Sequence, residues 1–179
     1  LSTPAQLAAL LVALRMRGET IDELAGFAAA MRERVVRVDA PAGVVDTCGT
    51  GGDKLNTFNI STTAAFIAVG AGVTIAKHGN RASTSPIGSA DVIEALGIPF
   101  DLGPDEAVRS LQRHGFAFFF APKYHPAFKH IVPARKLCAE RGQSTIFNFL
   151  GPLLNPAQPT AALVGVPRPE LCEPLACVL

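Results

Sequence analysis

The stretch VVDTCGTGGD, residues 44–53, predicts a short β-strand that ends in a glycine-rich turn. The strand is expected over residues 44–48, and the glycines that follow it let the backbone approach an anion closely. The turn lacks both the G-K-[ST] ending of a Walker loop and the G-x-G-x-x-G pattern of dinucleotide-binding proteins. A glycine-rich turn is by itself more often a tight turn than a binding site, so the neighbouring segments decide its meaning.

Predicted strands and helices alternate on the carboxyl-terminal side of this stretch. Such alternation predicts an α/β fold with a mainly parallel central sheet. The further strands are expected at residues 73–77, 116–120 and 161–166, and the helices at residues 62–69, 89–96 and 104–114.

The first forty residues predict two amphipathic helices. Thr3-Pro4 is a helix start, and a capping box at residues 20–23 begins the second helix. The chain turns helical again between residues 124 and 149. We therefore expect a small all-helical domain and a sheet domain. The helical domain would combine residues 1–40 with residues 123–150, and the sheet domain would combine residues 41–122 with residues 151–179.

Composition narrows the class of protein. Hydrophobic residues make up 49% of the chain and charged residues 17%, which favours a sizeable core over disorder. The net charge of +1 gives no electrostatic basis for a nucleic-acid or membrane partner. The four cysteines form no C-x-x-C pair, so free and mostly buried thiols in a reducing cytoplasm are expected. The chain has no initiating Met, and residues 169–179 read like a helix that stops early, so we expect a fragment of a longer enzyme.

Two more segments are rich in hydrogen-bond donors. TFNISTT, residues 57–63, lies where a helix should begin, and KHGNRASTS, residues 77–85, follows the second predicted strand. Taken singly, the first reads as a helix cap and the second as a solvated basic loop. The carboxyl ends of parallel strands, however, are where open α/β sheets bind ligands. Three donor-rich segments, each at a strand end or a helix start, favour an anion-binding site.

Six motifs together give this chain a specific resemblance. In order, they resemble the successive motifs of the anthranilate phosphoribosyltransferase family, over essentially the whole chain. They are GTGGD at 49–53, NIST at 59–62, the run at 77–85, GSAD at 88–91, APKYHPA at 121–127 and TIFNFLGPLLNP at 145–156.

The resemblance implies a fold, an activity and a setting. The fold would be nucleoside-phosphorylase/phosphoribosyltransferase-like, with a sheet that is incomplete at the carboxyl terminus. The activity would be transfer of the phosphoribosyl group of phosphoribosyl pyrophosphate to anthranilate in tryptophan biosynthesis. The resemblance also implies Mg²⁺, a cytoplasmic location and a homodimer formed through the helical domain, whose apolar faces include Leu7, Leu10, Leu14 and Phe27.

The resemblance also assigns residues. Arg135 would bind the anthranilate carboxylate, since a guanidinium fork can hold a carboxylate in bidentate fashion. Ser61 would ligate magnesium, and Lys77 and His78 would be catalytic. Gly49, His78, Asn80 and His125 would join Arg135 in contacting anthranilate. Phosphoribosyl pyrophosphate would be held by Gly49, Gly52, Asp53, Thr57, Asn59, Ile60, Ser61, Thr62, Lys77, His78, Gly79, Asn80, Arg81, Ala82, Ser83, Thr84, Ser85 and Ser89.

Some features depart from the family pattern. Thr84 replaces a usual Ser, Pro86 a common basic residue and Phe128 a common Met or Leu, and residues 137–144 form a longer connection. The Asp-Glu pair that completes the metal sites of the family is expected farther along, beyond residue 179. Asp105-Glu106 is not that pair, because it follows Pro104 in a helix first turn, where carboxylates favour the helix dipole. Residues 1–179 by themselves are therefore expected to be inactive.

Two other functions compete with this interpretation. A pyrimidine nucleoside phosphorylase has a related fold and a similar Lys-His loop, but the motifs at 88–91 and 147–156 favour the transferase. A silent, nucleic-acid-binding relative should have lost the loop at residues 49–53 and gained a basic face, and the sequence indicates neither.

Overall fold

The structure is a computed structural model that describes residues 2–52, 57–82 and 87–179. Its strands are β1 (Val45–Gly49), β2 (Ile75–Gly79), β3 (Phe116–Phe120) and β4 (Ala161–Gly165). Its α-helices are α1 (Pro4–Arg17), α2 (Ile21–Arg32), α3 (Ile60–Gly70), α4 (Ser89–Ala95), α5 (Pro104–His114), α6 (Ala121–Tyr124), α7 (Val132–Ala139) and α8 (Cys172–Val178). Short 3₁₀ helices are η1 (Pro126–His130), η2 (Ile146–Asn148), η3 (Gly151–Leu153) and η4 (Pro169–Leu171).

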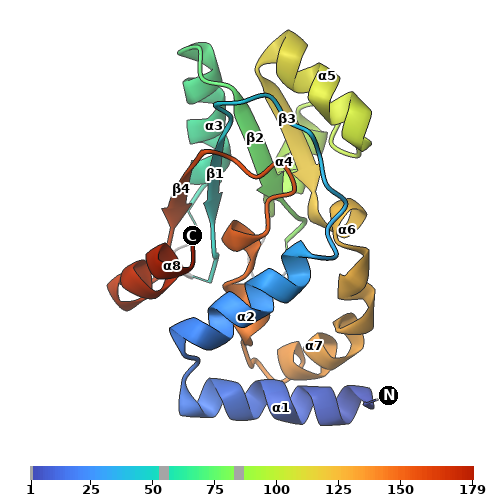
Figure 1. The fold of residues 1–179 in the computed structure, drawn as a ribbon, viewed down its shortest axis with the longest axis vertical. Helices are drawn as coiled ribbons and strands as arrows, with labels where there is room; N and C mark the ends of the chain where they lie inside the picture. Colours follow the sequence, from blue (N-terminus) through green and yellow to red (C-terminus); the bar gives the residue numbers. More distant parts are fainter. Residues whose placement is uncertain (1, 53–56, 83–86) are drawn as a thin grey trace.

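The four strands form one parallel sheet in the order β3-β2-β1-β4. The predicted α/β class with a parallel sheet is confirmed. Because the strands are parallel, their carboxyl ends share one edge. In Figure 1 this edge faces the end of the molecule where α1, α2 and α7 lie, while α3 and α5 lie beside the sheet.

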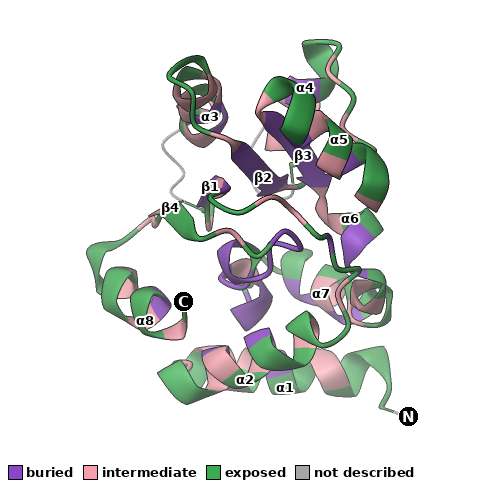
Figure 2. Cartoon of the chain, turned by 45° about the horizontal axis from the view of Figure 1, so that its top comes forward, coloured by how far each residue is buried: buried purple, intermediate pink, exposed green. Residues whose placement is uncertain are grey.

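Alternation along β3 builds a core on each face of the sheet. Phe116 and Phe118 belong to one buried cluster with residues of α3 and α4, whereas Ala117 and Phe119 belong to another with residues of α5. Successive side chains of a strand point to opposite faces, so a strand buried on both sides reads as one apolar run. Figure 2 shows β2 and β3 buried between their flanking helices.

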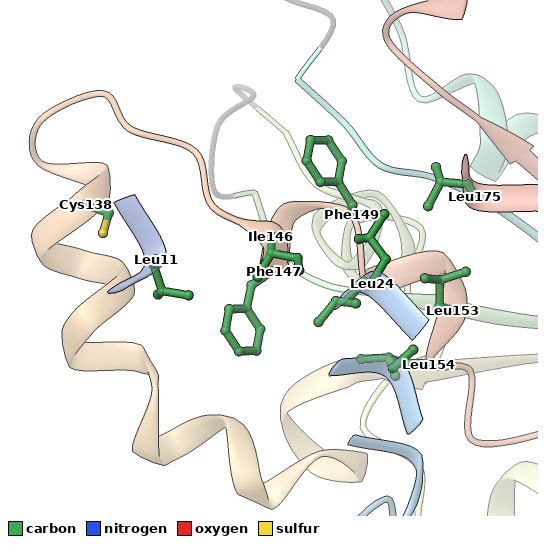
Figure 3. Packing of buried hydrophobic residues seen from close by; sticks show 11 residues of the cluster. Leu11, Leu24, Cys138, Ile146, Phe147, Phe149, Leu153, Leu154 and Leu175 are labelled. Atoms are coloured by element: carbon green, nitrogen blue, oxygen red, sulfur yellow. The ribbon is translucent and has the colours of Figure 1, made fainter. Parts of the chain in front are cut away.

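A third core joins the helical segments. Leu11 of α1, Leu24 of α2 and Cys138 of α7 pack around Ile146 and Phe147, as Figure 3 shows. Both predicted helix starts are confirmed as capping boxes, at Thr3 and at Thr20. The division into two domains remains a prediction.

Several expected boundaries and exposures differ from the structure. Strand β2 starts at Ile75 instead of residue 73, because the Val73 N–H donates to Ala68 O (3.0 Å) and closes the end of α3. On the first helix, Leu11 is buried whereas Leu10 is exposed.

The expectation for the cysteines is only partly right. The four thiols are free, but Cys172 and Cys177 are exposed and only Cys48 and Cys138 are buried. Helix α8 carries both exposed thiols. Within the described ranges, every helix is too short or too polar to cross a bilayer.

Candidate functional site

The donor-rich segments meet at the carboxyl edge of the sheet. Thr47, in the middle of β1, donates its hydroxyl to Ser61 O at the start of α3 (2.9 Å). The Asn59 side chain, just before α3, donates to Ile87 O, which lies between β2 and α4 (3.2 Å). The first bond joins the glycine-rich stretch to the start of α3, and Lys77 joins the third segment to both by donating its Nζ to Thr47 O and to Ser61 Oγ (3.2 Å). The three donor-rich segments are thus neighbours at one edge of the sheet, where open α/β sheets bind ligands.

The glycine-rich turn after β1 has a backbone that favours glycine. Gly51 and Gly52 have φ angles of 70° and 84°, the left-handed region in which a side chain is strained. The Thr50 N–H donates to Gly165 O of the neighbouring strand (3.0 Å), which fixes the start of the turn. The turn therefore leaves the sheet in a conformation with exposed backbone groups.

Lys77 lies under this edge instead of on the surface. It is only 1% exposed, and its Nζ donates to Thr47 O and to Ser61 Oγ, the latter at 3.2 Å. Burial lowers the pKa of the Lys77 amine, and the nearby Asp46 carboxylate opposes that shift. Lys77 thus reaches the start of α3 from within the sheet.

Asp46 and Asn155 form a buried polar link that the sequence pattern did not predict. Asp46 accepts from the His78 N–H (3.2 Å) and from Asn155 Nδ2 (2.8 Å). Asn155 also donates to Ala76 O (2.7 Å) and accepts from the Ala157 N–H (2.9 Å). Burial raises the pKa of Asp46. The position of Asp46 in the middle of the predicted strand at 44–48 could have indicated a buried partner, because a charge is rarely buried without one.

His78 and His125 meet in the interior. Their Nε2 atoms lie 3.1 Å apart, and His78 Nδ1 lies 3.1 Å from Gly151 O. Burial lowers the pKa of His78 to about 3 and that of His125 to about 4. Both rings are therefore neutral at pH 7, and a base with a pKa near 3 is a weak general base at that pH. The fold brings these two expected site residues into contact, although they are 47 positions apart in the sequence.

Arg135 of α7 projects into a cluster of aromatic rings. Its guanidinium carbon lies 5.8 Å from the centre of Phe128 and 5.7 Å from that of Phe147. Phe128 in turn lies 5.7 Å from the ring of His125. Burial lowers the pKa of Arg135, and its side chain has no hydrogen-bond or carboxylate partner in the part of the chain that is described. A half-buried cation without an acid partner is suited to an anionic ligand.

Arg81 faces the protein itself. Its Nη1 donates to Asp91 (2.9 Å) and to Glu94 (2.7 Å), and its guanidinium carbon lies 5.1 Å from the centre of the Phe100 ring. The expected contact of this side chain with phosphate is not visible in this arrangement. The Ser89 hydroxyl donates to Asn80 O (3.3 Å), so two of the residues expected at the phosphoribosyl pyrophosphate site are in contact.

The other expected site residues divide by exposure. Gly49, Thr57, Ile60 and Ala82 are exposed, whereas Thr62 is buried and donates its hydroxyl to Asn59 Oδ1 (3.4 Å). The Thr62 side chain therefore supports the start of α3, and only its backbone remains for a ligand. Gly79 is half-buried against Ser89. Asp53, Ser83, Thr84 and Ser85 lie outside the described residues.

Comparison with known families identifies this arrangement. Residues 41–179 match the model of the glycosyl transferase family, a/b domain, and residues 2–35 match that family's helical bundle domain. The chain belongs to this glycosyl transferase family. The predicted resemblance is confirmed as well: an anthranilate phosphoribosyltransferase of Symbiobacterium thermophilum is 57% identical over 179 residues, covering 99% of this chain and 52% of that protein.

Solved structures of glycosyl transferase relatives share the fold. Anthranilate phosphoribosyltransferase from Thermus thermophilus is 45% identical with a TM-score of 0.88, covering 98% of this chain and 53% of its own. The Saccharomyces cerevisiae enzyme in complex with PRPP and Mg is 35% identical with a TM-score of 0.87, covering 98% of this chain and 49% of its own. The chain thus spans about half the length of the relatives that it matches.

Proposed function

We propose that the whole enzyme represented by this chain is an anthranilate phosphoribosyltransferase. It transfers the phosphoribosyl group of phosphoribosyl pyrophosphate to the amine of anthranilate, giving N-(5-phosphoribosyl)anthranilate and pyrophosphate in tryptophan biosynthesis. The names of its relatives support this activity, and the yeast relative is described in complex with PRPP and Mg.

The environment of Arg135 is the observation that carries the proposal. An aromatic carboxylate needs a cation for its acid group and apolar surfaces for its ring. Arg135 lies against Phe128 and Phe147, and Phe128 leads to His125 and on to His78. Anthranilate is proposed to bind along this series, with Gly49 and Asn80 at the adjoining strand ends.

Phosphoribosyl pyrophosphate is proposed to bind at the carboxyl edge of the sheet. The exposed turn after β1, the first turn of α3 and the end of β2 offer backbone N–H groups and hydroxyls, the donors that phosphate oxygens accept from. The described residues assigned to this site are Gly49, Gly52, Thr57, Asn59, Ile60, Ser61, Thr62, Lys77, His78, Gly79, Asn80, Arg81, Ala82 and Ser89.

The reaction mainly requires stabilisation of the negative charge on the leaving group. Pyrophosphate departs from C1 of the ribose as negative charge builds on its oxygens, and donors aimed at those oxygens stabilise the transition state. Lys77 would contribute by holding the Ser61 hydroxyl and by its own positive charge. Holding the anthranilate amine against C1 accounts for roughly 7–11 kcal/mol of the barrier in favourable cases.

Magnesium fits the described residues only in part. Ser61 supplies one neutral oxygen, and this Oγ lies 3.2 Å from the Lys77 amine. The positive charge of Lys77 repels a magnesium ion at Ser61 unless anionic phosphates lie between the two cations. Within the described ranges, no group of three or more His, Cys, Asp or Glu side chains is arranged to hold a metal. Magnesium is therefore proposed to arrive with the substrate's phosphates, with Ser61 as one ligand.

A homodimer through the helical segments is also proposed. Met16 is 83% exposed and Leu10 is 53% exposed on α1, and Ile21 at the start of α2 is 39% exposed. Exposed apolar side chains on these two helices favour burial against a second copy. Light scattering at micromolar concentration should give twice the subunit mass, and a monomer mass would refute the proposal.

A cytoplasmic location is proposed for the enzyme, in keeping with its free thiols.

Substrate turnover tests the activity directly. The full-length enzyme is incubated with anthranilate and phosphoribosyl pyrophosphate, and in parallel with thymidine and inorganic phosphate. Magnesium-dependent formation of phosphoribosylanthranilate without phosphorolysis of thymidine is expected. Cleavage of thymidine instead would identify a pyrimidine nucleoside phosphorylase.

A further inference from the structure

The Asp91 carboxylate joins the two sides of a loop. Its Oδ2 accepts from the Gly88 N–H (2.8 Å) and from the Ala82 N–H (3.1 Å), and its Oδ1 accepts from Arg81 (2.9 Å). Ala82 precedes residues 83–86 and Gly88 follows them. One side chain therefore binds the main chain on both flanks of that segment.

Ordinary helix capping explains only one of these bonds. Asp91 is the third residue of α4, and its bond to Gly88 is the usual capping-box contact. Glu106 makes the same contact at α5, where it accepts from the Gly103 N–H (2.7 Å). Glu106 bonds to no second flank among the described residues. The bond to Ala82 and the ion pair with Arg81 are thus specific to Asp91.

Close backbone packing holds the same two flanks together. A Cβ atom on Gly88 would lie 2.3 Å from Ala82 N and 2.7 Å from Asn80 O. At the base of the loop, Ala90 N and the Ser89 hydroxyl both donate to Asn80 O, at 3.1 Å and 3.3 Å. The chain before the segment is therefore seated on the first turn of α4, and Asp91 is the charged group at the centre of this contact.

The contacts of Asp91 with Ala82 and Gly88 form a tether between the two flanks of the loop, and Arg81 takes part in it. Its guanidinium pairs with Asp91 and Glu94 and lies over Phe100, so it points along α4. The Asp91 side chain is 30% exposed. Its negative charge is partly offset by Arg81, which it shares with Glu94, and by two N–H donors.

We propose that Asp91 is a positioning residue that fixes the course of the main chain at Ala82 and Gly88 before phosphoribosyl pyrophosphate binds. This proposal rests on the proposed function for the identity of the ligand. In it, Arg81 acts through its ion pairs as part of the tether. A chain that is already ordered loses less entropy when the substrate arrives, so the effect falls on the KM for phosphoribosyl pyrophosphate.

The full-length protein carrying Asp91→Asn tests this tether, with Glu106→Gln as the matched control. Asparagine keeps the size of the side chain but removes the charge and one acceptor oxygen. Amide hydrogen exchange, measured by NMR, should become faster at Ala82 and Gly88 in the first variant. In the control it should change at Gly103 alone.

Kinetics then separate positioning from a purely structural role. Asp91→Asn should raise the KM for phosphoribosyl pyrophosphate by roughly tenfold, the effect of losing a charge-assisted hydrogen bond, and leave the KM for anthranilate unchanged. Glu106→Gln should leave both constants unchanged. Unchanged exchange at Ala82, or faster exchange with an unchanged KM, would overturn the proposal. Failure of the wild-type enzyme to use phosphoribosyl pyrophosphate would refute the proposed function instead, while the exchange rates still decide whether the tether exists.

Discussion

The Nε2 atoms of His78 and His125 lie 3.1 Å apart, and the other ring nitrogen of His78 lies 3.1 Å from Gly151 O. A carbonyl oxygen only accepts, so His78 Nδ1 carries a proton and His78 Nε2 is left as an acceptor. His125 Nε2 must then donate to it. One tautomer of each neutral ring satisfies this contact, and protonation of both rings would place two donors face to face.

Acid should therefore destabilise the fold through this pair. The pKa of His78 is lowered to about 3 and that of His125 to about 4, against an unfolded value of about 6.5. Between these values the unfolded chain binds more protons than the folded one, so the free energy of unfolding falls as pH drops below 6.5. The slope is at most about 1.4 kcal/mol per pH unit for each histidine. Urea unfolding from pH 7 to pH 4 measures it.

A histidine elsewhere provides the control for this slope. His125→Phe should flatten the dependence between pH 6.5 and pH 4, whereas His114→Gln, at the exposed end of α5, should leave it unchanged. Equal slopes in the wild type and in His125→Phe would show that the buried pair does not govern acid stability.

Arg135→Ala should selectively impair the use of anthranilate. A charge-assisted contact with the carboxylate would be lost, and the expected fall in kcat/KM for anthranilate is about ten- to a hundred-fold. The KM for phosphoribosyl pyrophosphate should be unaffected. Arg141→Ala, a change at an exposed arginine just beyond α7, serves as the control and should behave like the wild type. A loss confined to phosphoribosyl pyrophosphate would remove Arg135 from the anthranilate site.

Gly51→Val should weaken the binding of phosphoribosyl pyrophosphate. Gly51 has a φ of 70°, so valine would shift the turn away from its present course. Gly43→Val is matched to it, because Gly43 has a φ of 81° in the loop before β1. Both variants should lose roughly 1–2 kcal/mol of folding stability. Only Gly51→Val should raise the KM strongly, and equal KM values in the two variants would contradict the assignment of the turn.

Residues 1–179 purified alone are expected to be inactive and to aggregate. Strand β4 is at one edge of the sheet, and its Leu163 is 66% exposed. Exposed apolar edge strands pair with other chains, and a lysine on the edge discourages this. Leu163→Lys should therefore raise the concentration at which light scattering first detects aggregates. Magnesium-dependent phosphoribosyl transfer by residues 1–179 would contradict the expected inactivity.

Local patterns were sufficient to predict most elements. The helix at 104–114 and the strand at 116–120 were expected with the bounds that they have, because a proline, a glycine and a run of phenylalanines mark their ends. The start of β2 was expected at residue 73 but lies at Ile75. The Val73 N–H instead donates to Ala68 O at the end of α3, and the apolar pattern of the sequence does not predict this hydrogen bond.

The parallel α/β class, the two capped amino-terminal helices and the donor-rich segments at strand ends and a helix start could be predicted from local patterns, because each depends on residues close together in the chain. Which side chains meet depends on the three-dimensional fold. The bond between Asp46 and Asn155 joins residues 109 positions apart, and that between His78 and His125 joins residues 47 positions apart. Lys77, which reads as part of a basic loop, is buried because β2 lies between β1 and β3 in the sheet. Burial and partnership depend on how strands are ordered and how helices pack over them, and these are properties of the whole fold that no local pattern encodes.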